Sequence, residues 1–94
     1  MLVTEVRVTP FSDGGRLRAY ASITIGGSFA IRDIRVVEGP GGMIVAMPSK
    51  KLKDGSHKDV AFPITRGARE MVERAVLEEY RKVAAKGPAR RPRA

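Results

Sequence analysis

The chain has 94 residues, no cysteine and a formal net charge of +8 at neutral pH. This length allows one domain with one hydrophobic core, and the lack of cysteine excludes disulfides, thiolate metal ligands and thiol nucleophiles. The N-terminus lacks the basic start and long apolar run of a signal peptide, and no stretch approaches the roughly 20 apolar residues of a membrane span. We therefore expect a cytoplasmic protein without a membrane partner, with association with the nucleoid left open.

The positive charge is concentrated in two segments. Residues 50–69 contain six lysines and arginines against two aspartates, and residues 86–94 contain four basic residues and no acid. Each segment thus carries +4, and the remaining residues sum to zero. A neutral body with two basic segments is typical of a protein that binds a polyanion such as nucleic acid. A soluble surface with a frayed tail is the alternative interpretation.

The first half of the chain has the pattern of antiparallel strands. Residues 2–11 are rich in β-branched residues, and residues 16–25 alternate strictly between apolar and polar side chains. The pairs Gly14-Gly15 and Gly26-Gly27 follow these segments at the positions of hairpin turns. The pattern predicts two half-buried strands joined by tight turns.

A third strand is predicted over residues 28–38, but its alternation changes register at Arg32-Asp33. A β-bulge or a short irregular turn there would return the apolar side chains to the inner face. We expect Asp33, between Arg32 and Arg35, to be an ion-paired structural acid rather than a catalyst.

A continuous apolar run at residues 43–47 ends at Pro48. Such a run predicts a strand that is covered on both faces. A single helix covers only one face of a sheet, so we expect the chain to form a homodimer through the sheet. The predicted interface residues in this segment are Ile44, Val45 and Met47.

The C-terminal part is predicted to be one long helix over residues 66–86, with Thr65 as its N-cap. Its apolar residues recur every three or four positions and form one stripe. Leu77 and Tyr80 lie off the centre of that stripe, so we expect them to contact a second copy or another protein.

Together these elements predict an α+β fold, with an antiparallel sheet of four to five strands followed by one long C-terminal helix. The fifth strand is expected at residues 58–62, with Val60 and Phe62 pointing inward. Residues 1–86 form the single domain, and residues 87–94 form a disordered basic tail.

The residues needed for catalysis are largely missing. His57 is the one histidine, it lies in a predicted loop, and no further nitrogen or oxygen ligands stand at the spacing of a metal site. No serine has the glycine pattern of a nucleophile elbow. We expect neither an enzyme nor a metal, a cofactor or a small-molecule substrate.

The candidate site is cationic. Four lysines precede the predicted fifth strand or open it, and two arginines lie in the first turn of the helix, where backbone N–H groups are free to bind an anion. Arginines are locally unfavourable at this positive end of the helix dipole. Their presence there indicates a function such as contact with phosphate. The predicted nucleic-acid-binding residues are Lys50, Lys51, Lys53, Lys58, Thr65, Arg66 and Arg69.

Five segments of the chain resemble one known family in their order and spacing. They are Arg16-Leu17-Arg18-Ala19, Asp33-Ile34-Arg35-Val36-Val37, Val45-Ala46-Met47-Pro48-Ser49-Lys50, Asp59-Val60-Ala61-Phe62-Pro63-Ile64 and Leu77-Glu78-Glu79-Tyr80. Over about residues 1–82 they look like the stage V sporulation protein G (SpoVG) family of bacteria, and the Ala-Met-Pro-Ser segment is the most specific of them.

The resemblance implies a small α+β homodimer that binds DNA and RNA and regulates gene expression, with links to septation and sporulation. It also implies that the start of the long helix and nearby basic residues contact nucleic acid, here Thr65, Arg66, Ala68 and Arg69 with Lys50 and Lys51 beside them. Phe62 departs from the family, many of whose members have histidine before the proline.

The sequence therefore favours a non-catalytic, homodimeric nucleic-acid-binding regulator that acts on DNA and, in a wider interpretation, also on RNA. The alternative from another class is a protein-interaction adaptor of the division or sporulation machinery, with Leu77 and Tyr80 as its contact.

Overall fold

The computed structural model describes residues 2–11 and 14–85, which form an antiparallel sheet, a small hairpin and one C-terminal helix. The fold is α+β, as the sequence predicted. The elements in chain order are β1 (Val3–Pro10), β2 (Leu17–Ile25), β3 (Phe29–Gly39), β4 (Gly42–Ala46), β5 (Ser49–Lys51), β6 (His57–Asp59) and α1 (Arg66–Ala85). The predicted basic tail lies outside the described residues.

The first four strands form a simple meander in the order β1-β2-β3-β4, with every neighbouring pair antiparallel. The predicted turn at Gly26-Gly27 is present, and both glycines have positive φ angles, 58° and 68°. Two consecutive positive φ angles match the right-handed twist of the flanking strands at little steric cost to glycine. The connection between β2 and β3 thus follows directly from the sequence.

The predicted irregularity in β3 is a β-bulge. The pairing of β2 with β3 shifts register between Ala21 and Ile23, and Asp33 has a φ of 63°. The extra residue lets Ile31 and Ile34 both face the helix. The expected ion pair of Asp33 is absent from the part of the chain that the structure describes, and Arg35 donates instead to the Met47 carbonyl.

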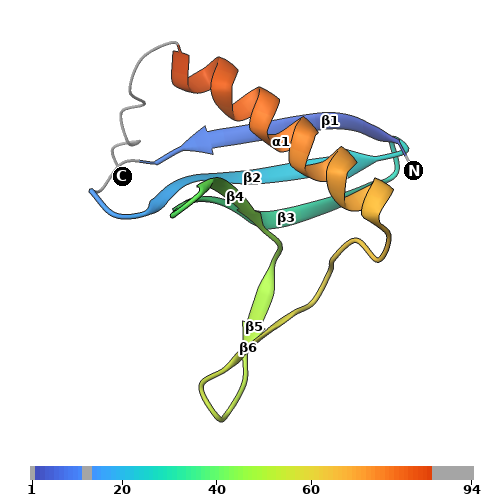
Figure 1. Ribbon diagram of the computed structural model, residues 1–94. Helices are drawn as coiled ribbons and strands as arrows, with labels where there is room; N and C mark the ends of the chain where they lie inside the picture. The colour runs from blue at the N-terminus through green and yellow to red at the C-terminus, as the bar shows by residue number, and fades with distance from the viewer. Residues whose placement is uncertain (1, 12–13, 86–94) are drawn as a thin grey trace, which may run out of the picture.

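The hydrophobic core lies between the sheet and α1, which crosses one face of the sheet (Figure 1). It contains small and aliphatic side chains from β2, β3 and β4, Met47 just after β4, and two valines of the helix. The buried members are Ala19, Ala21, Ile23, Ile34, Val36, Val45, Met47, Val72 and Val76. We call the four-stranded sheet and α1 together the body.

The helix begins at the predicted residue, and the centre of its apolar stripe packs as predicted. The Ala68 N–H donates a hydrogen bond to Thr65 Oγ1 at 3.1 Å, which makes Thr65 the N-cap. Val72 and Val76 lie at the centre of the apolar stripe and are buried. Leu77 and Tyr80 also pack against the core of this same chain. Their position therefore needs no partner to explain it, and their role in an interface stays a prediction.

The run at residues 43–47 is covered on one face only. Val45 and Met47 are each 7% exposed in the core, whereas Met43 and Ile44 are exposed. β4 is also an edge strand of the meander, so its outer edge has no neighbouring strand in the sheet. The burial of Val45 and Met47 thus needs no second copy, and dimerisation through the sheet stays a prediction.

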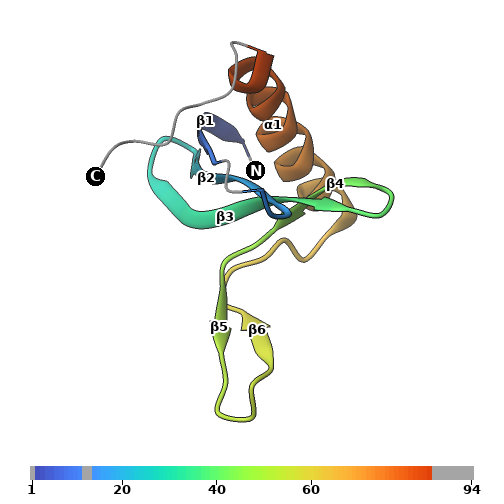
Figure 2. The ribbon, with the colours of Figure 1, turned by 90° about the vertical axis from the view of Figure 1, so that its left-hand side faces the viewer.

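The expected fifth strand at residues 58–62 was wrong in its extent and its orientation, because β6 ends at Asp59 and lies outside the four-stranded sheet. β6 pairs with β5 alone, and the two form a hairpin that projects from the body (Figures 1 and 2). Val60 and Phe62 are exposed rather than inward. The hairpin leaves the sheet, so there is no core for these side chains to enter. We call residues 49–59 the arm.

Candidate nucleic-acid interface

The arm is a short two-stranded ribbon closed at both ends by backbone hydrogen bonds. At its base the Val60 N–H donates to the Pro48 carbonyl at 2.9 Å, and near its tip the Leu52 N–H donates to the Ser56 carbonyl at 2.7 Å. Gly55 has a φ of 91°, which a glycine adopts in a tight turn without strain. The pair Asp54-Gly55 therefore forms the tip of the hairpin.

Asp54 organises that tip. Its Oδ1 accepts hydrogen bonds from the Ser56 hydroxyl at 2.6 Å and from the Ser56 N–H at 2.9 Å. These bonds stabilise the carboxylate, the hydroxyl bond more than the backbone bond, and so lower the pKa of Asp54 below its usual range. The tip is thus held by a charged side chain of the arm itself.

The arm concentrates lysine side chains. Lys50 lies directly opposite Lys58, and Lys51 lies opposite His57. Like charges placed directly opposite one another destabilise an antiparallel pair. Within residues 2–11 and 14–85, no arm lysine takes part in an ion pair. With Lys53 near the tip, four exposed cations stand against the carboxylates of Asp54 and Asp59.

The start of the helix carries less free positive charge than the sequence predicted. Arg66 Nε lies 3.6 Å from Glu70 Oε2, and Arg69 Nη1 lies 3.9 Å from Glu73 Oε2. Both pairs are exposed i, i+4 pairs and therefore weak, but each places a carboxylate beside the arginine. A phosphate bound there would compete with these acids.

The arm and the helix start are not brought into one compact patch. The arm extends away from the body, whereas the start of α1 is part of the body, and residues 60–65 connect the two (Figure 1). The predicted cationic residues therefore occupy two separate places. Among the described residues, the arm lysines are the members of this set that have no carboxylate partner.

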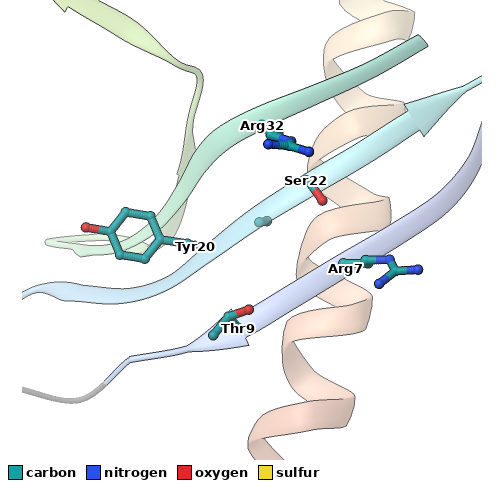
Figure 3. A pocket seen from close by; sticks show the side chains of 6 residues that line it. Arg7, Thr9, Tyr20, Ser22 and Arg32 are labelled. Carbon is teal, nitrogen blue, oxygen red and sulfur yellow. The ribbon is translucent and has the colours of Figure 1, made fainter. Parts of the chain in front are cut away.

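The sequence missed a second cationic region on the sheet. Arg7, Tyr20 and Arg32 line a hollow on the face that α1 leaves uncovered (Figure 3). The strict alternation of β2 was a signal for the location of Tyr20, but the arginines come from other strands. Arg18, which lies two residues before Tyr20, is instead ion-paired with Glu38, and that carboxylate raises the pKa of Arg18.

Neither a metal-binding cluster nor a membrane-spanning helix is found in the described part of the chain. Among the described residues, no group of three or more histidines, cysteines or acids is placed to hold a metal ion. Within residues 2–11 and 14–85, no helix is long and apolar enough to cross a membrane.

The structure is thus that of a small α+β protein whose helix α1 covers one face of a meander sheet and whose cationic hairpin projects from it. A sequence model of the SpoVG family matches residues 1–82. The chain belongs to the SpoVG family.

Its relatives are similar along most of their length. The protein named "Putative septation protein SpoVG" from Oceanobacillus iheyensis is 49% identical over 82 residues, which cover 87% of this chain and 85% of the relative. The protein of that name from Anaeromyxobacter sp. (strain Fw109-5) is 45% identical over 92 residues, or 98% of this chain and 94% of the relative. The one from Clostridium perfringens (strain 13) is 43% identical over 83 residues, or 88% and 92%.

Proposed function

We propose that this protein is a non-catalytic regulator that binds nucleic acid through its arm and acts in septation or sporulation. The process is inferred from the name that the relatives carry. The observation that carries the binding is the arm itself, a projecting hairpin with four exposed lysines and no ion pair within the described residues. The repulsion between opposed lysines destabilises the isolated arm, whereas a phosphate backbone would offset it.

The mechanism expected from this geometry is electrostatic. Each lysine that neutralises a phosphate releases condensed counterions, so the affinity falls as salt rises. The flexible, point-like ammonium groups position the protein on the backbone but read no base sequence. Arg66 and Arg69 remain candidates for additional contacts, provided that they exchange Glu70 and Glu73 for phosphate.

A salt titration of duplex binding tests the proposal. We expect the double variant Lys50→Ala, Lys58→Ala to bind more weakly and to reduce the slope of log K against log salt by roughly 0.9 for each phosphate that is no longer neutralised. The matched control is Arg81→Ala, Lys82→Ala, which removes the same charge from an exposed part of α1. If both variants weakened duplex binding equally, the arm would contribute only its net charge, and this result would contradict the proposal.

We further propose that the protein acts as a homodimer. Val60, Phe62 and Ile64, in the segment between the arm and α1, are 62%, 53% and 86% exposed. Ile44 of the edge strand β4 is also exposed. Large apolar side chains exposed close together are typical of a protein-interaction surface, and a second copy would bury them without a further component.

Sedimentation of the purified protein tests the dimer. We expect Phe62→Asp and Ile64→Asp to shift the equilibrium toward monomer, whereas Phe29→Asp, at an exposed apolar position on β3, leaves it unchanged. A wild-type protein that is monomeric at micromolar concentration would contradict the homodimer. The same apolar segment would then favour the adaptor as the alternative function.

A further inference from the structure

One face of the sheet is not covered by α1, and we call it the open face. A hollow lies on this face. Figure 3 looks onto this face, with α1 behind the sheet. The hollow has a volume of about 260 Å³ and is formed by three neighbouring strands. Its lining residues are Arg7, Thr9, Tyr20, Ala21, Ser22 and Arg32.

The strand register sets these side chains in two cross-strand rows. Thr9 of β1 lies opposite Tyr20 of β2, and Arg7 lies opposite Ser22. Directly opposed side chains on one face have Cβ atoms roughly 5 Å apart. The rows are two residues apart along the strand, or roughly 7 Å. An aromatic ring, two hydroxyls and cationic side chains are thus held together by regular pairing.

The bulge in β3 supplies the second arginine. Ile31 and Ile34 both pack toward the helix, so Asp33 is the extra residue and Arg32 is turned to the open face beside Ser22. A non-glycine residue at a φ of 63° is uncommon and costs free energy. Bulges are frequent where a side chain must be re-aimed next to a functional site.

The charge of the hollow is positive and only partly compensated. Arg7 Nε is 2.8 Å from Glu5 Oε2, in a pair that is well exposed on both sides. Arg32 has no carboxylate partner among the residues that the structure describes. An exposed pair such as that of Arg7 is worth little and exchanges readily for another anion.

Tyr20 is fixed at one end of the hollow. Its ring meets that of Phe11 edge to face, with centroids 5.9 Å apart and an angle of 72° between the planes. Tyr20 nevertheless keeps 45% of its surface exposed. An aromatic ring that is held in place but accessible loses little conformational freedom when a planar group stacks on it.

We propose that the open face binds single-stranded nucleic acid, with a base stacked on Tyr20 and backbone phosphates at Arg32 and Arg7. This inference rests on the proposed function and adds a second surface to it. Exposed aromatic rings beside cationic side chains bind single strands because every base has a stacking face. The bases of a duplex are stacked on one another and offer no such face to a sheet, so the hollow selects against duplexes.

Charge argues against a second copy on this face. In a symmetric dimer the same patch would meet itself, which would bring the arginines of both copies together. Like charges brought together across an interface cost free energy. A polyanion removes this repulsion.

The arm extends on the side of the sheet away from α1, where the open face also lies (Figure 2). Arg35, opposite Tyr20 on β3, donates from Nη2 to the Met47 carbonyl at the root of the arm, at 3.4 Å. A strand bound at Tyr20 therefore lies on the same side of the body as the arm lysines. Single strands would use both surfaces, whereas duplexes would use the arm alone.

Fluorescence anisotropy with a labelled single strand of about 12 nucleotides and with its duplex tests this division. We expect Tyr20→Ala and Arg32→Ala each to weaken single-strand binding by about tenfold, because one removes the stacking ring and the other a phosphate-binding group. Both variants should change duplex binding by less than about twofold. Tyr20→Phe keeps the stacking ring and should bind as wild type. Arg81→Ala controls for the removal of one positive charge, and circular dichroism verifies that each variant is folded.

Tyrosine emission gives a second, direct readout. The chain has two tyrosines and no tryptophan, so Tyr20 is the sole emitter in a Tyr80→Phe background. We expect the single strand to quench this emission and the duplex to leave it nearly unchanged. Glu5→Gln, which releases Arg7, should tighten single-strand binding.

The outcomes separate the two proposals. If wild type binds duplex but not single strand, or if Tyr20→Ala and Arg32→Ala bind the single strand as Arg81→Ala does, the open-face site is wrong and the arm proposal stands. If wild type binds neither nucleic acid, both proposals fall.

Discussion

The body buries many of its apolar side chains, whereas the arm exposes nearly all of its side chains. In the body, apolar residues from three strands and α1, together with Met47, share one buried core. Among the described residues no polar or charged one is buried with them. In the arm, all residues but Ser49 are exposed, and the ribbon is held by three register pairs and the hydrogen bonds of its turn. Substitutions in the body should therefore change stability, and substitutions in the arm should change binding.

Ile34→Ala should have the largest effect on stability. Ile34 lies on β3 and is fully buried in the core. Truncating a buried isoleucine to alanine costs about 2–5 kcal/mol, because transfer free energy is lost and a cavity is left behind. Urea denaturation measures the decrease. Lys50→Ala in the arm is the comparison and should stay within about 0.5 kcal/mol of wild type. Similar decreases for the two variants would erase the distinction between body and arm.

Thr65→Ala should cost about 1 kcal/mol, because the Ala68 N–H loses its hydrogen bond to Thr65 Oγ1. Thr65→Ser keeps the hydroxyl and should restore most of the stability. The same denaturation curves measure both variants. If alanine and serine were equivalent, Thr65 would not act as the cap.

Substitution of Asp33 in the bulge should change the free energy of unfolding by a smaller amount. Asp33→Gly should raise the free energy of unfolding by about 0.5–1 kcal/mol, since glycine accepts the positive φ. Asp33→Ala removes the same carboxylate but retains the backbone strain, so it should be less stable than the glycine variant. If Asp33→Ala were more stable than Asp33→Gly, the free-energy cost of the bulge would not come from the φ angle of Asp33.

The smallest effect is expected from pH. Because the folded arm lowers the pKa of Asp54, the carboxylate stabilises the tip above its ordinary pKa of 3.8, and that contribution disappears as the pH falls through the lower folded value. Amide exchange at Ser56 should therefore speed up, after correction for intrinsic rates, when the pH falls below about 4. Ser56→Ala should remove this dependence, and a tip equally protected at low pH in wild type would contradict it.

The sequence predicted the body well because the body follows local rules. The alternation in residues 17–25, the paired glycines at 26–27 and the cap at Thr65 each act over a few residues, and all three have the predicted structure. The bulge was visible as a change of parity at Asp33. These features need no knowledge of distant contacts.

The arm and the open face were harder to predict because they depend on where segments lie in space. Val60 and Phe62 alternate like strand residues, but their orientation was decided by β6 leaving the sheet with β5. Arg7 and Arg32 are distant in sequence and lie on either side of β2 only through the strand order. The carboxylates beside the two arginines at the helix start are different, because their i, i+4 spacing can be read from the sequence.

Backbone amide spectra recorded during titration with a short duplex test the central claim most directly. If the arm is the primary contact, the largest shift changes fall on residues 49–59, and they weaken when salt is raised, while the core of Ile34, Val36 and Val76 is unmoved. Shift changes confined to the body, with the arm lysines unaffected, would contradict the account.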